Sequence, residues 1–212
     1  MVRFKERKKI LHQAGTKEYL VCLSSMQRWC KILIDNTSNP YNDFLQFLLN
    51  NNFFMGTNDK VHIKDISAKY GIESSKISKW LAKIYEDINQ LNSEKPELFK
   101  TEGIKHELYF TYFDNYYSCT IWLKATPRIY ESFDFYFARA SLGFNIFYVE
   151  NVRHTVTDNE HSIEVTLKGG FVNRYREMLV DKGQFYGVIN LFNIFHQTDS
   201  EIDDELRKFY KH

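Results

Sequence analysis

The sequence predicts an α+β protein, in which an all-helical N-terminal region precedes a mainly antiparallel β region with one or two helices. Up to about residue 90, apolar residues recur at steps of three and four, the period of an amphipathic helix. After Gly103 the period shortens to about two, which is typical of a half-buried strand. Most of the 18 Phe, 14 Tyr and 3 Trp residues follow residue 98, and aromatic side chains favour sheets.

The chain is long enough for one large domain or two small ones, since it has 212 residues. The stretch 91–103 is polar and contains Pro96 and Gly103, which interrupt regular structure. We therefore expect a helical domain over 1–90, a linker over 91–103 and a β-rich aromatic domain over 104–212.

The helical region contains four predicted helices. Apolar spacing predicts one helix over 16–36 and, after the breaker sequence NTSNP, a second helix over 41–54. A short strand is expected at 61–63. Two further helices are expected within 65–84, on either side of Gly71.

The β region contains two predicted hairpins and one further strand. The runs 105–113 and 116–125 flank the dipeptide DN, which is a tight-turn signal. The runs 144–157 and 161–169 flank a second turn, and the stretch 132–140 alternates like a strand.

Helical spacing returns near the C-terminus. One helix is expected over 171–183, where Gly183 is a natural end. Residues 199–212 begin with acids and end with bases, which suits the dipole of a short helix.

Composition excludes several classes of protein. Hydrophobic residues make up 43% of the chain, which is enough for a core that needs no disulfide or metal to stabilise it. The three cysteines, Cys22, Cys30 and Cys119, are too scattered for a disulfide framework and are interpreted as buried small hydrophobes in a reducing compartment. No apolar run has the length of a signal peptide or a membrane span, so we expect a soluble cytoplasmic protein with no membrane partner.

The charges are distributed unevenly along the chain. Residues 1–87 carry 14 Lys or Arg against 9 Asp or Glu, and the remainder carries 14 against 18. A polyanion should therefore prefer the N-terminal half. A basic arm at the N-terminus is interpreted either as a source of phosphate or minor-groove contacts or as a solvated tail. Its charged members are Arg3, Lys5, Arg7, Lys8 and Lys9.

The stretch DISAKYGIESSKISKWLAKI, residues 65–84, has the pattern of two short helices joined by a sharp turn. Ile66 and Tyr70 stand four apart and share a face, and the small Ser67 lies where a second helix would approach. Gly71 suits a left-handed turn, and Ile72 would close the corner.

The second helix of this stretch has a buried face and a basic face. Ser74 or Ser75 is expected to cap it with a hydroxyl group. Ile77, Trp80 and Leu81 recur at steps that direct them to the core. Lysines and serines remain on the outward face.

The stretch resembles a bacterial helix-turn-helix, with Ser67 where alanine is commonest. The resemblance covers about twenty residues and implies that the second helix enters the major groove of DNA. It places Ser75, Lys76 and Lys79 nearest to bases or phosphates, and Lys69 with Lys64 near the backbone. The DNA-binding residues that it implies are Lys69, Glu73, Ser74, Ser75, Lys76, Ser78, Lys79 and Lys83.

Two details of this site stay open at the level of sequence. Glu73 either accepts a hydrogen bond from a cytosine amino group or simply lies at the turn. The hairpin 105–125 is either the wing of a winged helix or part of the β-rich domain, and its acidic, aromatic tip favours the second reading. No arginine lies in the second helix, so strong bidentate reading of guanine is not expected from it.

The aromatic half carries no catalytic signature. His154 and His161 flank a turn, but no cysteine or carboxylate spacing completes a metal site, and LKGG at 167–170 lacks the rest of a phosphate loop. We therefore expect no enzyme activity, no metal and no cofactor. The aromatic sheet would serve as a filled core and a dimer interface, or hold a small ligand or single-stranded nucleic acid.

Taken together, the sequence predicts a DNA-binding protein that acts as a transcriptional regulator on double-stranded DNA. The β-rich domain would mediate homo-oligomer formation or sensing. The alternative is a replication or conjugation accessory protein, or a structural assembly protein, in which the helix-turn-helix only packs.

Overall fold

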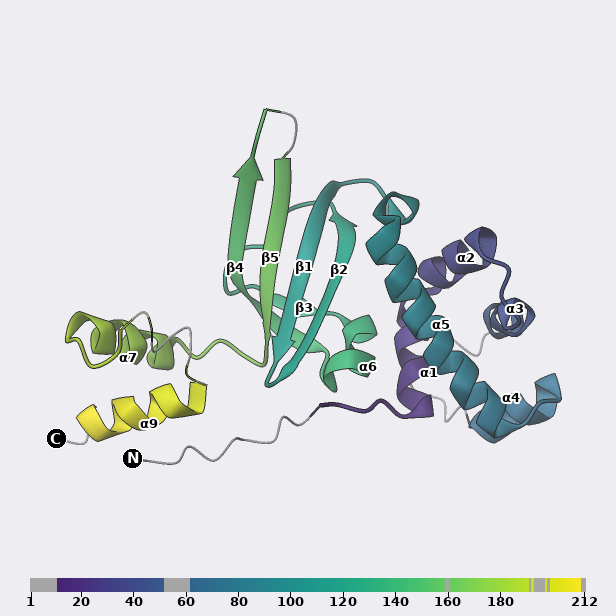
Figure 1. The fold of residues 1–212 in the computed structure, drawn as a ribbon, viewed down its shortest axis with the longest axis horizontal. Helices are drawn as coiled ribbons and strands as arrows, with labels where there is room; N and C mark the ends of the chain where they lie inside the picture. Colours follow the sequence, from purple (N-terminus) through teal and green to yellow (C-terminus); the bar gives the residue numbers. More distant parts are fainter. Residues whose placement is uncertain are drawn as a thin grey trace. The chain divides into compact units, whose positions relative to one another are not determined.

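The computed structural model describes residues 11–51, 62–158, 161–190, 192, 197 and 199–210. The chain divides into two compact units, Met1–Phe171 and Val172–His212, and each is described by itself (Figure 1). The predicted basic arm at 3–9, the end of the predicted helix 41–54 and the first residue of the predicted strand 61–63 lie outside the described residues. The rest of that strand prediction was wrong, because His62 is the N-cap of helix α4 and Ile63 is its first residue.

The first unit begins with a group of helices. The described helices are α1 (Thr16–Ser25), α2 (Gln27–Asn36), α3 (Asn42–Asn50), α4 (Ile63–Tyr70) and α5 (Ser74–Glu94).

The predicted continuous helix 16–36 was wrong, because the chain breaks at Met26. The Ser24 hydroxyl donates to the carbonyl of Val21 at 2.6 Å, and the Ser25 hydroxyl donates to that of Cys22 at 2.7 Å. Such bonds offer the backbone an alternative to the helical ladder. A new helix then starts, with the amide of Trp29 donating to the carbonyl of Met26.

The helices are followed by a five-stranded sheet with the order β2-β1-β5-β4-β3. Pairs β1–β2, β4–β5 and β3–β4 are antiparallel and β1–β5 is parallel, so the α+β class with a mainly antiparallel sheet is confirmed. The strands are β1 (Ile104–Tyr112), β2 (Asn115–Leu123), β3 (Ser132–Asp134), β4 (Ile146–Val156) and β5 (His161–Gly169).

Both predicted hairpins are present. In the first, the loop is Phe113–Asp114, one residue earlier than predicted, and Phe113 has a φ of 50°. Because β1 lies between β2 and β5, this hairpin is built into the sheet and is not a separate wing.

The predicted strand 132–140 is correct only over β3. The chain then leaves the sheet through the 3-10 turn η2 (Tyr136–Ala138) and the short helix α6 (Arg139–Leu142). This path buries Phe137, whose ring meets those of Trp29 at 5.2 Å and Tyr85 at 4.7 Å. The aromatic side chains of this segment therefore pack into the core instead of alternating across a strand.

One continuous core joins the helices to one face of the sheet. Leu108 and Phe110 of β1 are buried on that face, and the ring of Phe110 stacks on that of Phe135 at 5.1 Å. On the helical side, Trp29 contacts Phe99 edge-on at 5.0 Å. The helical region and the sheet therefore fold as a single unit.

The predicted linker 91–103 lies inside this unit, so the division after Phe171 does not coincide with it. Helix α5 continues to Glu94, and the 3-10 turn η1 (Pro96–Phe99) follows with Phe99 buried. The guanidinium of Arg28 donates to the carbonyls of Phe99 and Lys100 and fixes this segment to α2.

Asn92, near the end of α5, covers the edge of β2. Its side chain is 2% exposed, donates to the carbonyl of Thr120 at 2.9 Å and accepts from the amide of Thr120 at 2.8 Å. The carboxamide thus makes both bonds that a neighbouring strand would make, and helix α5 blocks further strand pairing there.

The three cysteines are buried and free, as predicted. Burial raises the pKa of the Cys22, Cys30 and Cys119 thiols to about 12. They therefore remain protonated and act as small apolar side chains at neutral pH.

The second unit contains α7 (Arg174–Phe185) and α9 (Asp199–Tyr210), which agree with the two predicted helices. The helices run side by side in the same direction (Figure 1). Arg176 near the start of α7 pairs with Asp203 near the start of α9, and Lys182 lies over the ring of Tyr210 at the other end.

Gly183 was predicted to end the first of these helices, and this prediction was wrong. It lies buried inside α7, where α9 approaches. A Cβ atom there would lie 2.7 Å from Cδ2 of Leu206, so glycine permits the close contact.

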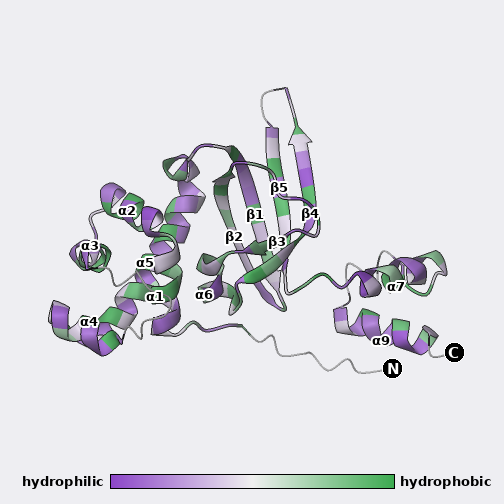
Figure 2. Cartoon of the chain, turned by 180° about the vertical axis from the view of Figure 1, so that it is seen from behind, coloured by the Kyte–Doolittle hydropathy of each residue, from purple (hydrophilic) through white to green (hydrophobic). Residues whose placement is uncertain are grey.

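In Figure 2, hydrophilic and hydrophobic segments alternate along α4, α5 and α9, as expected for helices with one face in a core. Within the described residues, the helices lack the combination of length and apolarity that a membrane crossing requires.

Candidate nucleic-acid interface

Helices α4 and α5 are joined by the three-residue turn Gly71–Glu73. Gly71 has φ 79° and ψ 27°, which is the left-handed region, and its amide donates to the carbonyl of Ser67. A residue with a Cβ atom would be strained in this conformation. The sharp turn therefore follows from the glycine that the sequence places there.

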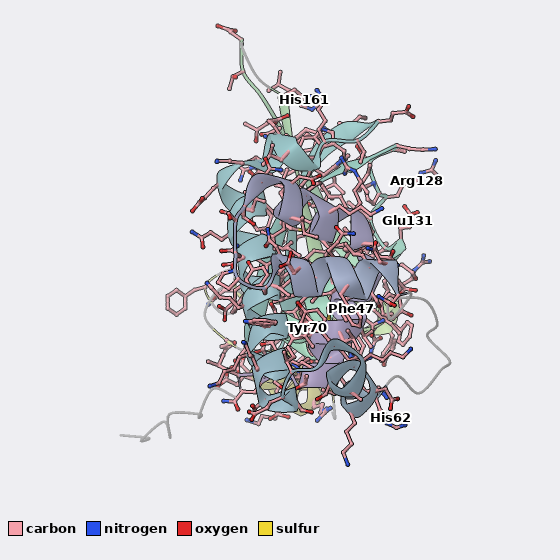
Figure 3. All side chains as sticks on the ribbon, turned by 90° about the vertical axis from the view of Figure 1, so that its right-hand side faces the viewer. Phe47, His62, Tyr70, Arg128, Glu131 and His161 are labelled. Atoms are coloured by element: carbon pink, nitrogen blue, oxygen red, sulfur yellow. The ribbon has the colours of Figure 1, made fainter. Side chains whose placement is uncertain are left out.

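The inner faces of the two helices pack as the apolar spacing predicts. Ile66, Ile77 and Leu81 are fully buried. The ring of Tyr70 meets that of Phe47 at 4.9 Å, and Figure 3 shows the two side by side. The pair of helices therefore rests on α3 and on the common core.

Ser67 lies where alanine is commonest in the motif that the sequence resembles. Its hydroxyl group donates to the carbonyl of Ile72 at 2.5 Å. The serine therefore has a hydrogen-bond partner and ties α4 to the far side of the turn.

The predicted hydroxyl cap of α5 was wrong. The residue at the N-cap is Glu73, and its side chain makes no capping hydrogen bond. Ser74 is already the first helical residue, and the hydroxyl of Ser75 donates to the Glu73 carboxylate at 3.2 Å. The first turn of α5, with both serines, is exposed.

A continuous exposed stripe runs along α5 from its first turn. Its members follow one another at steps of three and four, so they share a face. In order they are Lys76, Lys79, Lys83, Glu86 and Gln90. Positive charge is therefore concentrated in the N-terminal half of the helix.

The three lysines of this stripe differ in their surroundings. The ammonium group of Lys76 lies 4.7 Å from the centroid of the Trp80 ring, which attracts it and holds it near the helix surface. Lys79 is exposed. Lys83 binds the Asp87 carboxylate at 2.9 Å, and this hydrogen bond raises the pKa of Lys83.

Asp87 also accepts a hydrogen bond from the hydroxyl of Tyr41. Lys83 is thus attached to a local polar cluster, and its charge is partly compensated. Of the lysines on α5, Lys76 and Lys79 present the most available positive charge.

Ser78 lies away from the outward face. It is half-buried, donates to the carbonyl of Ser74 at 2.9 Å and accepts from the hydroxyl of Thr16 at 2.8 Å. The structure therefore brings Glu73, Ser74, Ser75, Lys76 and Lys79 together and directs Ser78 towards α1. Lys69 is exposed in the last turn of α4.

The contact between Thr16 and Ser78 reveals a neighbour that the sequence did not indicate. It places the start of α1 beside the first turns of α5, and the exposed Lys17 follows Thr16 directly. The two bonded residues are 62 positions apart, so no local pattern could have joined them.

A second cluster of polar side chains lies in the sheet. Nδ1 of His154 lies 3.0 Å from Nε2 of His161 across β4 and β5, and the rings stack at 5.3 Å. Figure 3 shows His161 at the opposite end of the first unit from His62, which is the residue before α4 and makes no side-chain capping bond. Among the described residues, histidine, cysteine and acidic side chains form no group of three that could hold a metal ion.

The chain shows no significant match to a protein-family model, to a curated protein sequence or to a solved structure. The geometry of the α4–α5 pair therefore carries the functional interpretation by itself.

Proposed function

We propose that this chain is a cytoplasmic helix-turn-helix protein that binds double-stranded DNA and regulates transcription. The observation that supports the proposal most directly is the exposed lysine stripe in the first half of α5, directly after a glycine turn. In helix-turn-helix proteins, this part of the second helix lies in the major groove.

The exposed groups at the start of α5 suit a phosphate-lined groove. Lys76 and Lys79 neutralise phosphates, and association releases counterions. The hydroxyl groups of Ser74 and Ser75 and the first backbone amides of the helix donate to phosphate oxygens or base edges. Glu73 accepts from a cytosine amino group where the helix approaches one.

The second helix carries no arginine, so base discrimination by this helix is modest. A homo-oligomer compensates by placing two copies of α5 on the same duplex. In a dimer that follows one face of B-DNA, the two copies would lie about 34 Å apart.

The proposal is tested by the salt dependence of duplex binding, measured by fluorescence anisotropy. Each lysine that contacts a phosphate contributes about one to the slope of log K against log salt. Lys76→Ala combined with Lys79→Ala should therefore reduce the slope by about two. Lys83→Ala should change it less, because Asp87 already binds that lysine.

The matched control is Lys95→Ala combined with Lys100→Ala. Both lysines are exposed, and Lys95 follows the far end of α5, about 30 Å from its start. An equal loss of slope in the control would show that binding is non-specific attraction to the whole chain.

Charge reversal gives the stronger test of the same site. Lys76→Glu combined with Lys79→Glu should abolish duplex binding without lowering the melting temperature, since neither side chain is buried. Unchanged binding would place the site elsewhere. A flat salt dependence of the unmodified chain would favour the replication, conjugation or assembly role, in which the α4–α5 pair only packs.

A further inference from the structure

The described part of the second unit has a small core. In its described part, the buried apolar side chains are those of Ile189, Ile202 and Leu206. Chains of about 40 residues usually need a disulfide, a metal or association in order to be stable. Residues 172–212 contain no cysteine, and the described residues offer no metal-ligand cluster. Association with a partner would add buried apolar surface to this small core.

Helix α7 presents large apolar side chains to solvent. Tyr175 is 67% exposed, Met178 is 52% exposed and Phe185 is 84% exposed. They are separated by three and seven residues, so they lie along one side of the helix, where the exposed Lys182 also stands between Met178 and Phe185. An exposed stripe of this kind marks a contact surface.

A groove lies between α7 and α9 on one side of the unit. It has a volume of about 350 Å³ and is lined by Tyr175, Leu179, Leu206 and Tyr210 together with the polar side chains of Asn173, Arg176, Asp203 and Arg207. The Arg176 guanidinium crosses it to the Asp203 carboxylate at 2.7 Å. Grooves between helices accept the apolar face of another helix.

The charge pattern of α9 is complementary to itself when reversed. Its first seven residues include five acids, and Arg207 and Lys208 follow in the last turn. Within one copy, Arg176 binds Asp199 and Asp203, and Arg207 binds Asp204. Two copies of α9 in opposite directions would in addition bring the acidic end of each helix against the basic end of the other. The unit is also close to neutral, with six Lys or Arg and seven Asp or Glu, which favours association.

We propose that residues 172–212 form a homodimerisation element in which a second copy of this chain is the partner. The two copies are related by a two-fold axis, with α9 opposed to α9 and the apolar side of α7 in the groove of the other copy. Such an interface is self-complementary and closed. The inference goes beyond DNA binding and assigns the dimer contact to two helices instead of the aromatic sheet.

The first test measures the mass of the full chain in solution by light scattering or sedimentation, without DNA. The unmodified chain should have twice its 25.4 kDa mass. Met178→Asp combined with Phe185→Asp should halve the measured mass. Phe113→Asp, at a side chain 75% exposed in the first unit, is the matched control and should remain dimeric.

The second test identifies the partner and the direction of pairing. One chain carries Glu201→Lys with Asp204→Lys, and another carries Arg207→Glu with Lys208→Glu. Each should be monomeric alone, and an equimolar mixture should restore the doubled mass.

Three results would overturn the proposal. A monomeric unmodified chain would mean that these helices have no second copy as partner and dock on their own chain instead. A dimer that survives Met178→Asp with Phe185→Asp would place the interface elsewhere. A mixture of the two charge variants that stays monomeric would reject the antiparallel arrangement. Since mass is measured without DNA, failure of DNA binding leaves each outcome interpretable.

Discussion

The pairs α4–α5 and α7–α9 are both short helical arrangements, but they differ in what lies beneath them. The first pair rests on a core shared with the sheet, and its outward side carries lysines and serines. Among the described residues, the buried apolar side chains around the second pair are Ile189, Ile202 and Leu206, and aromatic side chains are exposed. The inner face of the first pair is buried against a large core, so its outer face is open to a charged partner. The second pair has little core beneath it, so it would gain stability from an apolar partner.

Glycine serves the two pairs for different reasons. Gly71 adopts a left-handed conformation, and the space where a Cβ atom would lie is open, so the backbone angle is what requires glycine. At Gly183 the backbone is helical, and an added Cβ atom would lie 2.7 Å from Cδ2 of Leu206, so the close approach of α9 is what favours glycine. The same residue type thus marks a turn in one pair and a contact in the other.

The largest expected effect concerns the unequal cores. Phe44→Ala removes a fully buried ring that meets both Tyr70 and Trp80, and should lower the free energy of unfolding of the first unit by about 3–5 kcal/mol. Ile202→Ala should leave that value unchanged. Tryptophan fluorescence in a urea titration measures it, because all three tryptophans lie before residue 172.

An equal shift of the fluorescence midpoint in both variants would contradict this contrast, since the two units would then unfold together. The Ile202→Ala chain should instead lose helical circular dichroism at lower urea than the unmodified chain. Its effect would thus be confined to the second unit.

An intermediate effect is expected at the turn between α4 and α5. Gly71→Ala forces a side chain into the left-handed region and should cost about 1–2 kcal/mol in the same titration. Gly71→Asn is the control, because asparagine adopts the left-handed conformation more readily and no heavy atom lies within 4 Å of an added Cβ there, so it should cost less. A neutral Gly71→Ala variant would mean that the turn relaxes without loss of packing.

The smallest expected effect is the pH dependence of the first unit. Burial lowers the pKa of His106 below its ordinary value of 6.5, and a smaller contribution comes from the nearby His154. The unfolded chain therefore binds the proton more readily than the folded chain. The contribution of neutral His106 to the free energy of unfolding is fully present above pH 6.5 and decreases as the pH falls below that value. One such group contributes at most about 1.4 kcal/mol per pH unit.

Urea titrations between pH 7 and pH 5 would measure this slope. His106→Gln should flatten it, whereas His62→Gln, at an exposed imidazole, should retain it. A slope that His106→Gln leaves unchanged would assign the dependence to other groups.

Features set by neighbouring residues could be predicted from the sequence. The strands from 104 to 169 were predicted because alternation is a property of adjacent residues, and the α4–α5 turn because Gly71 sits between two apolar patterns. The break at Met26 was missed, because it depends on serine hydroxyls that bond backward within the helix.

Features set by distant contacts could not be predicted. The stretch 132–140 alternates, yet it leaves the sheet because Phe137 finds Trp29 and Tyr85 in the core. The segment 91–103 is polar, yet it stays in the first unit through Asn92 and Phe99. In the candidate site, Ser78 was predicted to contact DNA. The local sequence does not indicate that its hydroxyl group is hydrogen-bonded to Thr16, which lies 62 positions away.

Helix α5 connects the candidate DNA-binding surface with the edge of the sheet. One end carries Lys76 and Lys79, and the other end is hydrogen-bonded through Asn92 to the backbone of an edge strand. Its 21 residues form a rod about 30 Å long. Between its ends, Leu81, Ile84 and Ile88 are fully buried in the core that the helix shares with the sheet. The position of the two lysines is therefore fixed relative to the strands, so a DNA duplex bound there would keep a constant orientation to the sheet.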